Sequence, residues 1–530
     1  MLILIGLVTL LARLAVLPCS TELNMDADAP HFMNVARCFE RGQGFSNPAA
    51  WPTWMKPERL PMPETFKEPA YPWMISKLTP LTKSPFRAGQ TISFLAGLFT
   101  PFFTWMLMRR LRPQRAVADL AALMVAVSPL LIAYSARVMV ESVYTAVFTL
   151  LWVTLVPRPG GIGRGRRALD LAVDAAAGVL LGFAFMLRAQ TLLAAPAVAV
   201  QLFMRGDSIA ATLRRAAVVF AAAVLTASPF LLRNLRLFGT PLYSDVAAFG
   251  LMPYSDYYAV WGHLERPSVP FDWVLHHFPQ VLGQIAISAV IFAGSTLPQM
   301  ILGNPAWTVP LAAGVLLSLS CWRKWLFLYV YVGLTIMVIF TIKWVDRYFA
   351  STVPLWCAIT APGALWLAGA LDRAPLVGRL RGRHLLVGTL VALVALQAAA
   401  AREDVRKQFA PENAAARAES SFLRTHLAPD EAVMVLTTSY YAYWSDRPAV
   451  FVVLADSTGF MGEMRRLKVR YAALPTSALA GLATRYPGGR LPAALVFDHA
   501  NEASDVTVFR IVDRAAPSVP GHGPRPTTTR

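Results

Sequence analysis

Long apolar runs are the feature of this sequence that most limits what the chain can become. They recur through the first 401 of its 530 residues, and most reach or approach the roughly 17–25 residues that a helix needs to cross a bilayer. Hydrophobic residues make up 56% of the chain and charged residues 15%, whereas a soluble domain carries about 25% charge. The sequence therefore predicts an α-helical polytopic membrane protein. Its first seven apolar runs cover residues 2–18, 88–108, 116–134, 138–156, 170–187, 190–204 and 216–232.

The positions of the basic residues predict which loops face the cytoplasm. The net charge is +18, and the excess lies in short loops between apolar runs. This is the positive-inside pattern and not the basic, aromatic-rich face of a nucleic-acid-binding protein, so no nucleic-acid partner is expected. The N-terminus is then cytoplasmic. The basic loops, predicted to lie inside, are 109–115, 157–167 and 205–215. The loops between them, predicted to lie outside, are 19–86, 137–141, 188–190 and 233–278.

Five further apolar runs decide the number of spans. If all five crossed the membrane, the basic groups at 323–324 and 379–383 would lie outside, against the positive-inside rule. If the run 279–302 is instead a re-entrant or interfacial helix, both groups return to the cytoplasm. The sequence thus predicts about 11 transmembrane helices in the plasma (inner) membrane, with the C-terminal part outside. The five runs are 279–302, 305–321, 325–342, 347–370 and 384–401.

Changes in composition predict three regions. Residues 1–401 are the transmembrane domain, with 19–86 as the first external loop and 233–302 as a second external loop plus the re-entrant or interfacial helix. Residues 402–514 are predicted to form a small extracytoplasmic α/β domain, because short apolar strands alternate there with helix-like runs. Residues 515–530 are rich in Pro, Thr and Gly and are expected to be disordered. The expected strands are Ala432–Leu436, Val450–Leu454, Leu495–Phe497 and Val506–Ile511.

Two carboxylates, Asp26 and Asp28, stand directly after the first apolar run and before the helix-like run 32–39. An Asp in this position is a common helix N-cap. A catalytic role is the alternative, because other ionisable residues gather at the same predicted face. Ionisable groups at membrane depth are costly and tend to mark function. A carboxylate can take a proton from an acceptor hydroxyl, and Arg or Lys can hold a lipid phosphate. The residues concerned are Asp26, Asp28, Lys67, Glu141, Arg188, Arg233 and Arg347.

Several short motifs resemble bacterial GT-C glycosyltransferases, the relatives of protein mannosyltransferases and lipid A aminoarabinose transferases. The resemblance covers about residues 1–400, and the motifs occur in the family's order and on the expected side of the membrane. They are Asp26-x-Asp28-x-Pro30-His31-Phe32 with Ala36-Arg37 and Gly42-x-Gly44-Phe45, Lys67-Glu68-Pro69-Ala70-Tyr71-Pro72, Glu141, the turn at Arg188, Pro229-Phe230-x-x-Arg233-Asn234, and Arg347-Tyr348-x-x-x-x-x-Pro354.

This resemblance implies an inverting transfer of a sugar from a polyprenyl-phosphate donor to a protein, lipid or glycan hydroxyl at the external face. It assigns Asp28 as the base and Glu141 as an aid to the acceptor. Lys67, Arg188, Arg233 and Arg347 would hold the lipid phosphate. The usual Glu after the catalytic Asp is Ala29 here, so Asp26 is the candidate to supply that charge. No cofactor is expected, since the histidines are scattered, although a divalent metal is not excluded.

Two other classes remain as alternatives. A transporter or flippase of lipid-linked glycans would favour internal repeats and charges near the membrane midplane. The sequence shows no convincing repeat, and the charges lie at the ends of spans. A membrane-anchored binding protein would place its function in residues 402–514, which contain no recognisable catalytic cluster.

Overall fold

The computed structural model divides into two compact units. The first contains the described residues of Met1–Ser46, Pro63–Pro253 and Arg266–Ala410, and the second contains those of Asn47–Met62 and Pro411–Arg530. The predicted disordered tail 515–530, most of the loop 233–278 and most of the basic loop 157–167 fall outside the described residues. The structure describes residues 1–26, 28–50, 58–157, 167–205, 208–245, 275–300, 302–303, 305–341, 346–373, 382–407, 411–453, 457–486 and 488–512.

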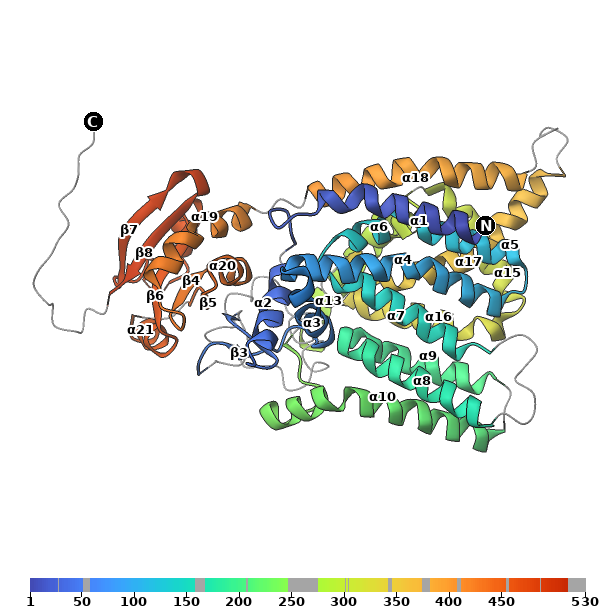
Figure 1. The fold of residues 1–530 in the computed structure, drawn as a ribbon, viewed down its shortest axis with the longest axis horizontal. Helices are drawn as coiled ribbons and strands as arrows, with labels where there is room; N and C mark the ends of the chain where they lie inside the picture. The colour runs from blue at the N-terminus through green and yellow to red at the C-terminus, as the bar shows by residue number, and fades with distance from the viewer. Residues whose placement is uncertain are drawn as a thin grey trace, which may run out of the picture. The chain divides into compact units, whose positions relative to one another are not determined.

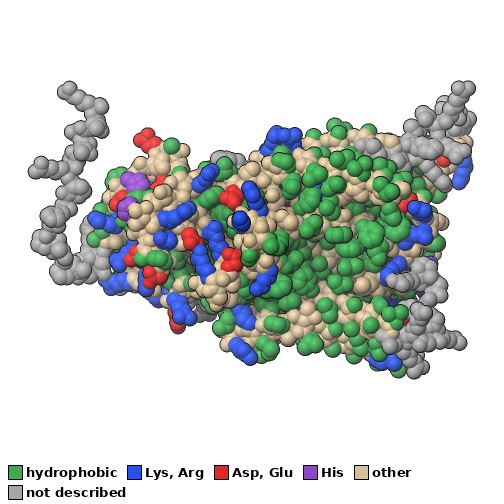
Figure 2. Space-filling model, viewed as in Figure 1, with side chains coloured by type: hydrophobic (Ala, Val, Ile, Leu, Met, Phe, Trp, Pro, Cys, Tyr) green, Lys and Arg blue, Asp and Glu red, His purple; other side chains and the backbone are tan. Residues whose placement is uncertain are grey.

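The first unit is a bundle of apolar helices (Figure 1). Within the described residues, six helices are long and apolar enough to cross a membrane. Large apolar side chains such as Leu225 and Val290 lie on its surface, and Figure 2 shows hydrophobic side chains spread over the helical unit. Such a surface suits lipid contact. The six helices are α1 (Leu2–Val16), α4 (Pro85–Leu111), α8 (Arg167–Leu187), α10 (Ile209–Phe238), α13 (Phe278–Ile291) and α17 (Val353–Leu371).

Shorter apolar helices and the 25-residue helix α18 complete the bundle, and the total of 11 spans stays a prediction. The helix α13 continues through a π-helical turn to Thr296, and this stretch has the length and composition of a span. The re-entrant or interfacial placement of 279–302 therefore also stays a prediction. The remaining helices are α5 (Arg115–Ala126), α6 (Pro129–Ala136), α7 (Val140–Leu155), α9 (Ala194–Phe203), α15 (Thr308–Leu319), α16 (Leu326–Thr341) and α18 (Gly382–Arg406).

The run 116–134, expected to be one straight helix, is broken. Helices α5 and α6 meet at an angle of 53°, because Pro129 has no N–H to continue the α5 hydrogen-bond ladder. The side chain of Arg13 on α1 is fully buried at this break and donates from Nη1 to the Ala126 carbonyl at 3.1 Å. A carbonyl at the end of α5 thus gains a charged donor. The break brings the end of α6 close to α7, which carries Glu141 in its first turn.

The first long polar loop contains two helices, α2 (Asp28–Glu40) and α3 (Ala70–Thr82). They pack on each other, and the Phe32 and Tyr71 rings meet edge to face with centroids 5.0 Å apart. The Tyr71 hydroxyl is hydrogen-bonded to Ser93 on α4 at 2.9 Å. The loop is therefore folded against the bundle, which fixes where its charged residues lie.

The second unit contains a six-stranded mixed sheet in the order β2-β5-β4-β6-β8-β7. The pairs β2/β5, β5/β4 and β4/β6 are parallel, and β6/β8 and β8/β7 are antiparallel. Strand β2 comes from the first loop, almost 400 residues before β5, so this unit is not confined to the residues after 402. The strands are β2 (Ala49–Ala50), β4 (Ala432–Val435), β5 (Ala449–Phe451), β6 (Val469–Pro475), β7 (Leu495–Asn501) and β8 (Val506–Ile511).

Helices accompany this sheet, and the unit has its own apolar core. The helices are α19 (Pro411–His426), α20 (Thr438–Ser445), α21 (Ser457–Arg466) and α22 (Leu479–Ala483). The core joins side chains of several strands, such as Val450 and Phe509, to Phe460 and Met464 on α21. The sheet therefore has the mixed α/β character that alternating strands and helices produce.

Candidate functional site

The two carboxylates after the first span have different roles in the structure. Asp26 Oδ1 accepts a hydrogen bond from the Asp28 backbone N–H at 3.0 Å, and the Asp26 carbonyl accepts one from the Ala29 N–H. Asp26 thus satisfies two N–H groups at the start of α2, as a capping residue does. Because Asp26 supplies the cap, the Asp28 side chain is available for other contacts. Ala29, where the sequence resemblance would place a second acidic residue, is buried. That Asp26 supplies this charge stays a prediction.

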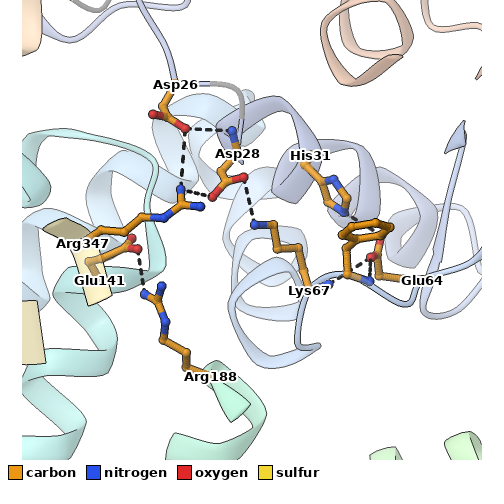
Figure 3. A network of polar contacts seen from close by, with 9 residues as sticks. Asp26, Asp28, His31, Glu64, Lys67, Glu141, Arg188 and Arg347 are labelled. Atoms are coloured by element: carbon orange, nitrogen blue, oxygen red, sulfur yellow. Dashed lines mark hydrogen bonds and ion pairs between the residues drawn. The ribbon is translucent and has the colours of Figure 1, made fainter. Parts of the chain in front are cut away.

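Asp28 lies between two cations from distant parts of the chain (Figure 3). Its Oδ1 is 2.9 Å from Lys67 Nζ, and its Oδ2 accepts a hydrogen bond from Arg347 Nη1. The side chains of Asp28, Lys67 and Arg347 are 21%, 16% and 19% exposed. Burial alone would raise the pKa of Asp28, but the charges of Arg347 and Lys67 outweigh it and hold that pKa below its usual range. Asp28 is therefore an ionised carboxylate held by two cations.

Asp26 belongs to the same charge network but has a different electrostatic environment. Its Oδ1 is 4.0 Å from Arg347 Nη1. Burial, followed by the negative charge of Asp28, raises the pKa of Asp26, and Arg347 opposes this only in part. Two neighbouring carboxylates with pKa values shifted in opposite directions are typical of a site that handles protons.

A second ion pair, between Glu141 and Arg188, lies beside the first. Arg188 Nη1 is 2.7 Å from Glu141 Oε1, and the Glu141 side chain is only 2% exposed. The Arg188 guanidinium lies 4.7 Å from the centre of the Tyr348 ring, and the Arg347 guanidinium lies 5.7 Å from the same ring. Tyr348 therefore connects the two ion pairs through cation–π contacts. Figure 3 shows Glu141 near Arg347 as well as Arg188.

Glu64, which belongs to none of the motifs above, organises the loop that carries Lys67. One oxygen, Oε1, accepts from the backbone N–H groups of Thr65, Phe66 and Lys67 at 3.0, 2.6 and 3.0 Å. The other, Oε2, is 2.7 Å from Nε2 of His31 on α2. Glu64 thus joins the Lys67 loop to the helix that begins with Asp28.

Glu68 performs a similar task on the other side of Lys67. Its carboxylate accepts a hydrogen bond from the Ala189 N–H at 2.9 Å, directly after Arg188. Burial raises the pKa of Glu68, and this hydrogen bond and the charge of Arg188 oppose the rise. The backbone segments that carry Lys67 and Arg188 are therefore tied together.

Arg233 is the predicted phosphate ligand that the structure does not bring to these carboxylates. It donates to the carbonyls of Glu64 at 2.8 Å and Phe45 at 3.0 Å, and to Asn234 Oδ1 at 2.9 Å. Its guanidinium also lies 4.8 Å from the Phe45 ring centre. These contacts fix the backbone around Glu64 and Phe45, and phosphate binding by Arg233 stays a prediction. Among the described residues, no group of three His, Cys, Asp or Glu is placed to hold a metal ion.

Comparisons with known proteins agree with this fold. Residues 63–232 match the family model of dolichyl-phosphate-mannose-protein mannosyltransferases, a range that includes Lys67, Glu141 and Arg188. No curated protein matches the sequence. The resemblance to the GT-C superfamily of glycosyltransferases is confirmed, and the chain is that of an integral membrane protein.

Two solved structures illustrate how far the fold is shared. ArnT from Cupriavidus metallidurans bound to undecaprenyl phosphate is 14% identical, with 99% of each chain covered and a TM-score of 0.58. The oligosaccharyltransferase AglB from Archaeoglobus fulgidus, in complex with an inhibitory peptide and a dolichol-phosphate, is 11% identical. The similarity covers 97% of this chain and 74% of that one, with a TM-score of 0.61. At such identities the shared property is the fold.

Proposed function

We propose that this protein is an inverting glycosyltransferase that moves a sugar from a polyprenyl-phosphate donor to an acceptor hydroxyl at the external membrane face. The observation that carries the proposal is the position of Asp28 between Lys67 and Arg347. A carboxylate is there next to cations that suit a phosphate, on a fold whose solved examples bind undecaprenyl phosphate and dolichol-phosphate. A base and a leaving-group clamp are the two elements that this transfer needs.

Each step of the proposed reaction is assigned to one or two of these residues. The acceptor oxygen attacks the anomeric carbon of the sugar from the face opposite the phosphate, and its proton passes to the Asp28 carboxylate. The bond between the anomeric carbon and the phosphate oxygen breaks, and its electron pair stays on that oxygen. Lys67 and Arg347 stabilise the negative charge that develops there. Attack from the opposite face inverts the anomeric configuration.

Glu141 and Arg188 have supporting roles in this proposal. Glu141 Oε2 is buried and has no hydrogen-bond partner among the described residues, so it can accept a hydrogen bond from a hydroxyl of the acceptor. Arg188 compensates the charge of Glu141 at 2.7 Å and adds positive potential near the phosphate. These contacts recognise the phosphate and an acceptor hydroxyl, and they do not select a particular sugar or acceptor.

The external placement rests on the charge pattern of the loops. Asp28 and Lys67 belong to the loop 19–86, which lies opposite the basic loops in the positive-inside topology. A reactive sugar carried by a membrane lipid would reach such a site along the bilayer surface. Labelling of single cysteines at exposed Glu58 and at exposed Gln114 with an impermeant reagent tests this placement, with only the Glu58 position labelled from outside.

The test of the activity is transfer by the Asp28→Asn variant. Membranes containing the full-length protein are supplied with radiolabelled polyprenyl-monophosphate hexoses and pentoses, and label is counted in membrane and envelope acceptors. The wild type transfers label, and Asp28→Asn reduces the rate by roughly a hundredfold or more. Glu403→Gln, which alters an exposed carboxylate on α18, is the matched control and keeps the rate. If Asp28→Asn transferred label at the wild-type rate, the assignment of Asp28 as the base would be wrong.

A further inference from the structure

The proposed base and the proposed phosphate-binding cations are bonded to each other in this structure. Both oxygens of Asp28 are occupied, Oδ1 by Lys67 at 2.9 Å and Oδ2 by Arg347. These cations cannot give the same contacts to a donor phosphate while they keep them with Asp28. An Asp28 so held is also a weak acceptor for a proton. In this arrangement Asp28 and its two cations each prevent the other from taking its proposed role.

The charge balance indicates that the ion pairs of this network must change when the donor binds. Three cations (Lys67, Arg188 and Arg347) face three carboxylates (Asp26, Asp28 and Glu141). The Glu68 carboxylate is near two of the same cations, so the network has no surplus of positive charge. A polyprenyl-phosphate-linked sugar is a phosphodiester and brings one further negative charge. In a site shielded from water, that surplus is unfavourable unless a carboxylate leaves its cations or takes a proton.

Asp28 is the carboxylate that can leave its cations most easily. Its side chain is 21% exposed, whereas that of Glu141 is 2% exposed and remains with Arg188. The backbone of Asp28 is fixed independently of its side chain, because its N–H is capped by Asp26. A rotation of the Asp28 side chain is therefore sufficient to release both cations, with no change in α2.

The cations, by contrast, are held in place by other contacts. Lys67 Nζ lies 5.5 Å from the centre of the Phe32 ring, and the backbone N–H of Lys67 is bound by Glu64 at 3.0 Å. Arg347 lies against the Tyr348 ring and is attracted by the charge of Glu141. Lys67 and Arg347 can thus stay where they are while the anion between them changes.

We propose that the donor phosphate replaces the Asp28 carboxylate on Lys67 and Arg347, and that this exchange frees Asp28 to act as the base. The inference rests on the proposed function and deepens it, since it makes the base active only when a donor is bound. Once its cations turn to the phosphate, the proton affinity of Asp28 rises. The proton that it then accepts comes from the attacking acceptor hydroxyl.

The exchange makes an unusual prediction: the variant that loses catalysis gains lipid affinity. Equilibrium binding of radiolabelled undecaprenyl phosphate to the full-length protein in detergent is measured for wild type, Asp28→Asn and Asp28→Ser. Both variants remove the competing charge and keep a small polar side chain at the start of α2. Each should bind roughly five- to tenfold more tightly than the wild type, the scale of one or two partly exposed ion pairs.

Controls separate this inference from the proposed function. Undecaprenol, which lacks the phosphate, should bind equally to the wild type and Asp28→Asn, and Glu403→Gln should bind undecaprenyl phosphate like the wild type. Lys67→Met should weaken phosphate binding, and it should shrink the gain from Asp28→Asn when the two are combined. If Lys67→Met binds as tightly as the wild type, the phosphate site of the proposed function is wrong. If Lys67→Met weakens binding but neither Asp28 variant strengthens it, only the exchange is overturned.

Discussion

Glu64 offers the sharpest test of how the site is held together. The prediction is that Glu64→Ala disorganises the Lys67 loop, whereas Glu64→Gln leaves it largely intact. In the structure one Glu64 oxygen receives three backbone N–H groups and the other meets His31 at 2.7 Å. The residue is only 2% exposed, so water cannot easily replace the carboxylate.

The expected magnitude follows from these contacts. A hydrogen bond to a charged group contributes about 1.5–3 kcal/mol, and a buried donor left without a partner costs about 1–3 kcal/mol. Three N–H groups share one oxygen, and two of them lie in partly exposed residues, so their contributions do not simply add. Glu64→Ala should therefore destabilise the fold by about 3–5 kcal/mol. Glu64→Gln retains an acceptor for the three N–H groups and should cost about 1 kcal/mol.

Two measurements check this prediction. Thermal unfolding of the full-length protein in detergent should give the order wild type, Gln variant, Ala variant from most to least stable. Binding of undecaprenyl phosphate should be weaker in Glu64→Ala and close to normal in Glu64→Gln, because Lys67 keeps its position only in the second. Glu403→Ala, on an exposed helix surface, is the control for loss of a carboxylate. An Ala variant with wild-type stability and lipid affinity would refute the reasoning.

Two further predictions concern the carboxylates. Glu141→Gln should destabilise the protein by about 3–5 kcal/mol, because it leaves Arg188 as a buried charge without its partner. Glu141→Leu combined with Arg188→Met should recover the stability but not the sugar transfer. A double variant less stable than Glu141→Gln would contradict this prediction. Asp26→Asn keeps the helix cap and removes a carboxylate whose raised pKa makes ionisation unfavourable in the fold. It should be more stable than the wild type above that pKa, by at most about 1 kcal/mol, and lose the advantage as the pH falls through it. The check is unfolding of both proteins from pH 8 to pH 4. If the stability of Asp26→Asn relative to the wild type increases in acid, the pKa of Asp26 is lowered and not raised.

The membrane character of the chain could be predicted because length and polarity decide it locally. An apolar run of about 20 residues needs no partner to be recognised, and most runs of the first 232 residues are helices at the expected places. Pro129 was a sequence signal for the break between α5 and α6. It lies inside the apolar run 116–134, which reads as one continuous span. Strand β2 had none, since a pair of alanines becomes a strand only through its partner β5.

The site illustrates the same limit with charged residues. Asp28, Lys67, Glu141, Arg188 and Arg347 were found from motifs, and the structure brings them into one network. Which cation meets which carboxylate depends on how distant segments pack, and no spacing in the sequence contains that information. Glu64 was missed for the same reason, because its partners are backbone N–H groups and a histidine that only the folded loop presents to it.

The contacts of Asp28 with Lys67 and Arg347 also bear on the stability of the site. Isolated cations near a membrane surface would repel one another and attract any available anion. Asp28 gives Lys67 and Arg347 an internal anion of the correct charge, held at the place where the donor phosphate is expected. In the proposed exchange, this carboxylate becomes available for chemistry when the donor phosphate takes its place on the two cations. The Asp28→Asn variant would then bind the lipid more tightly and fail to transfer the sugar.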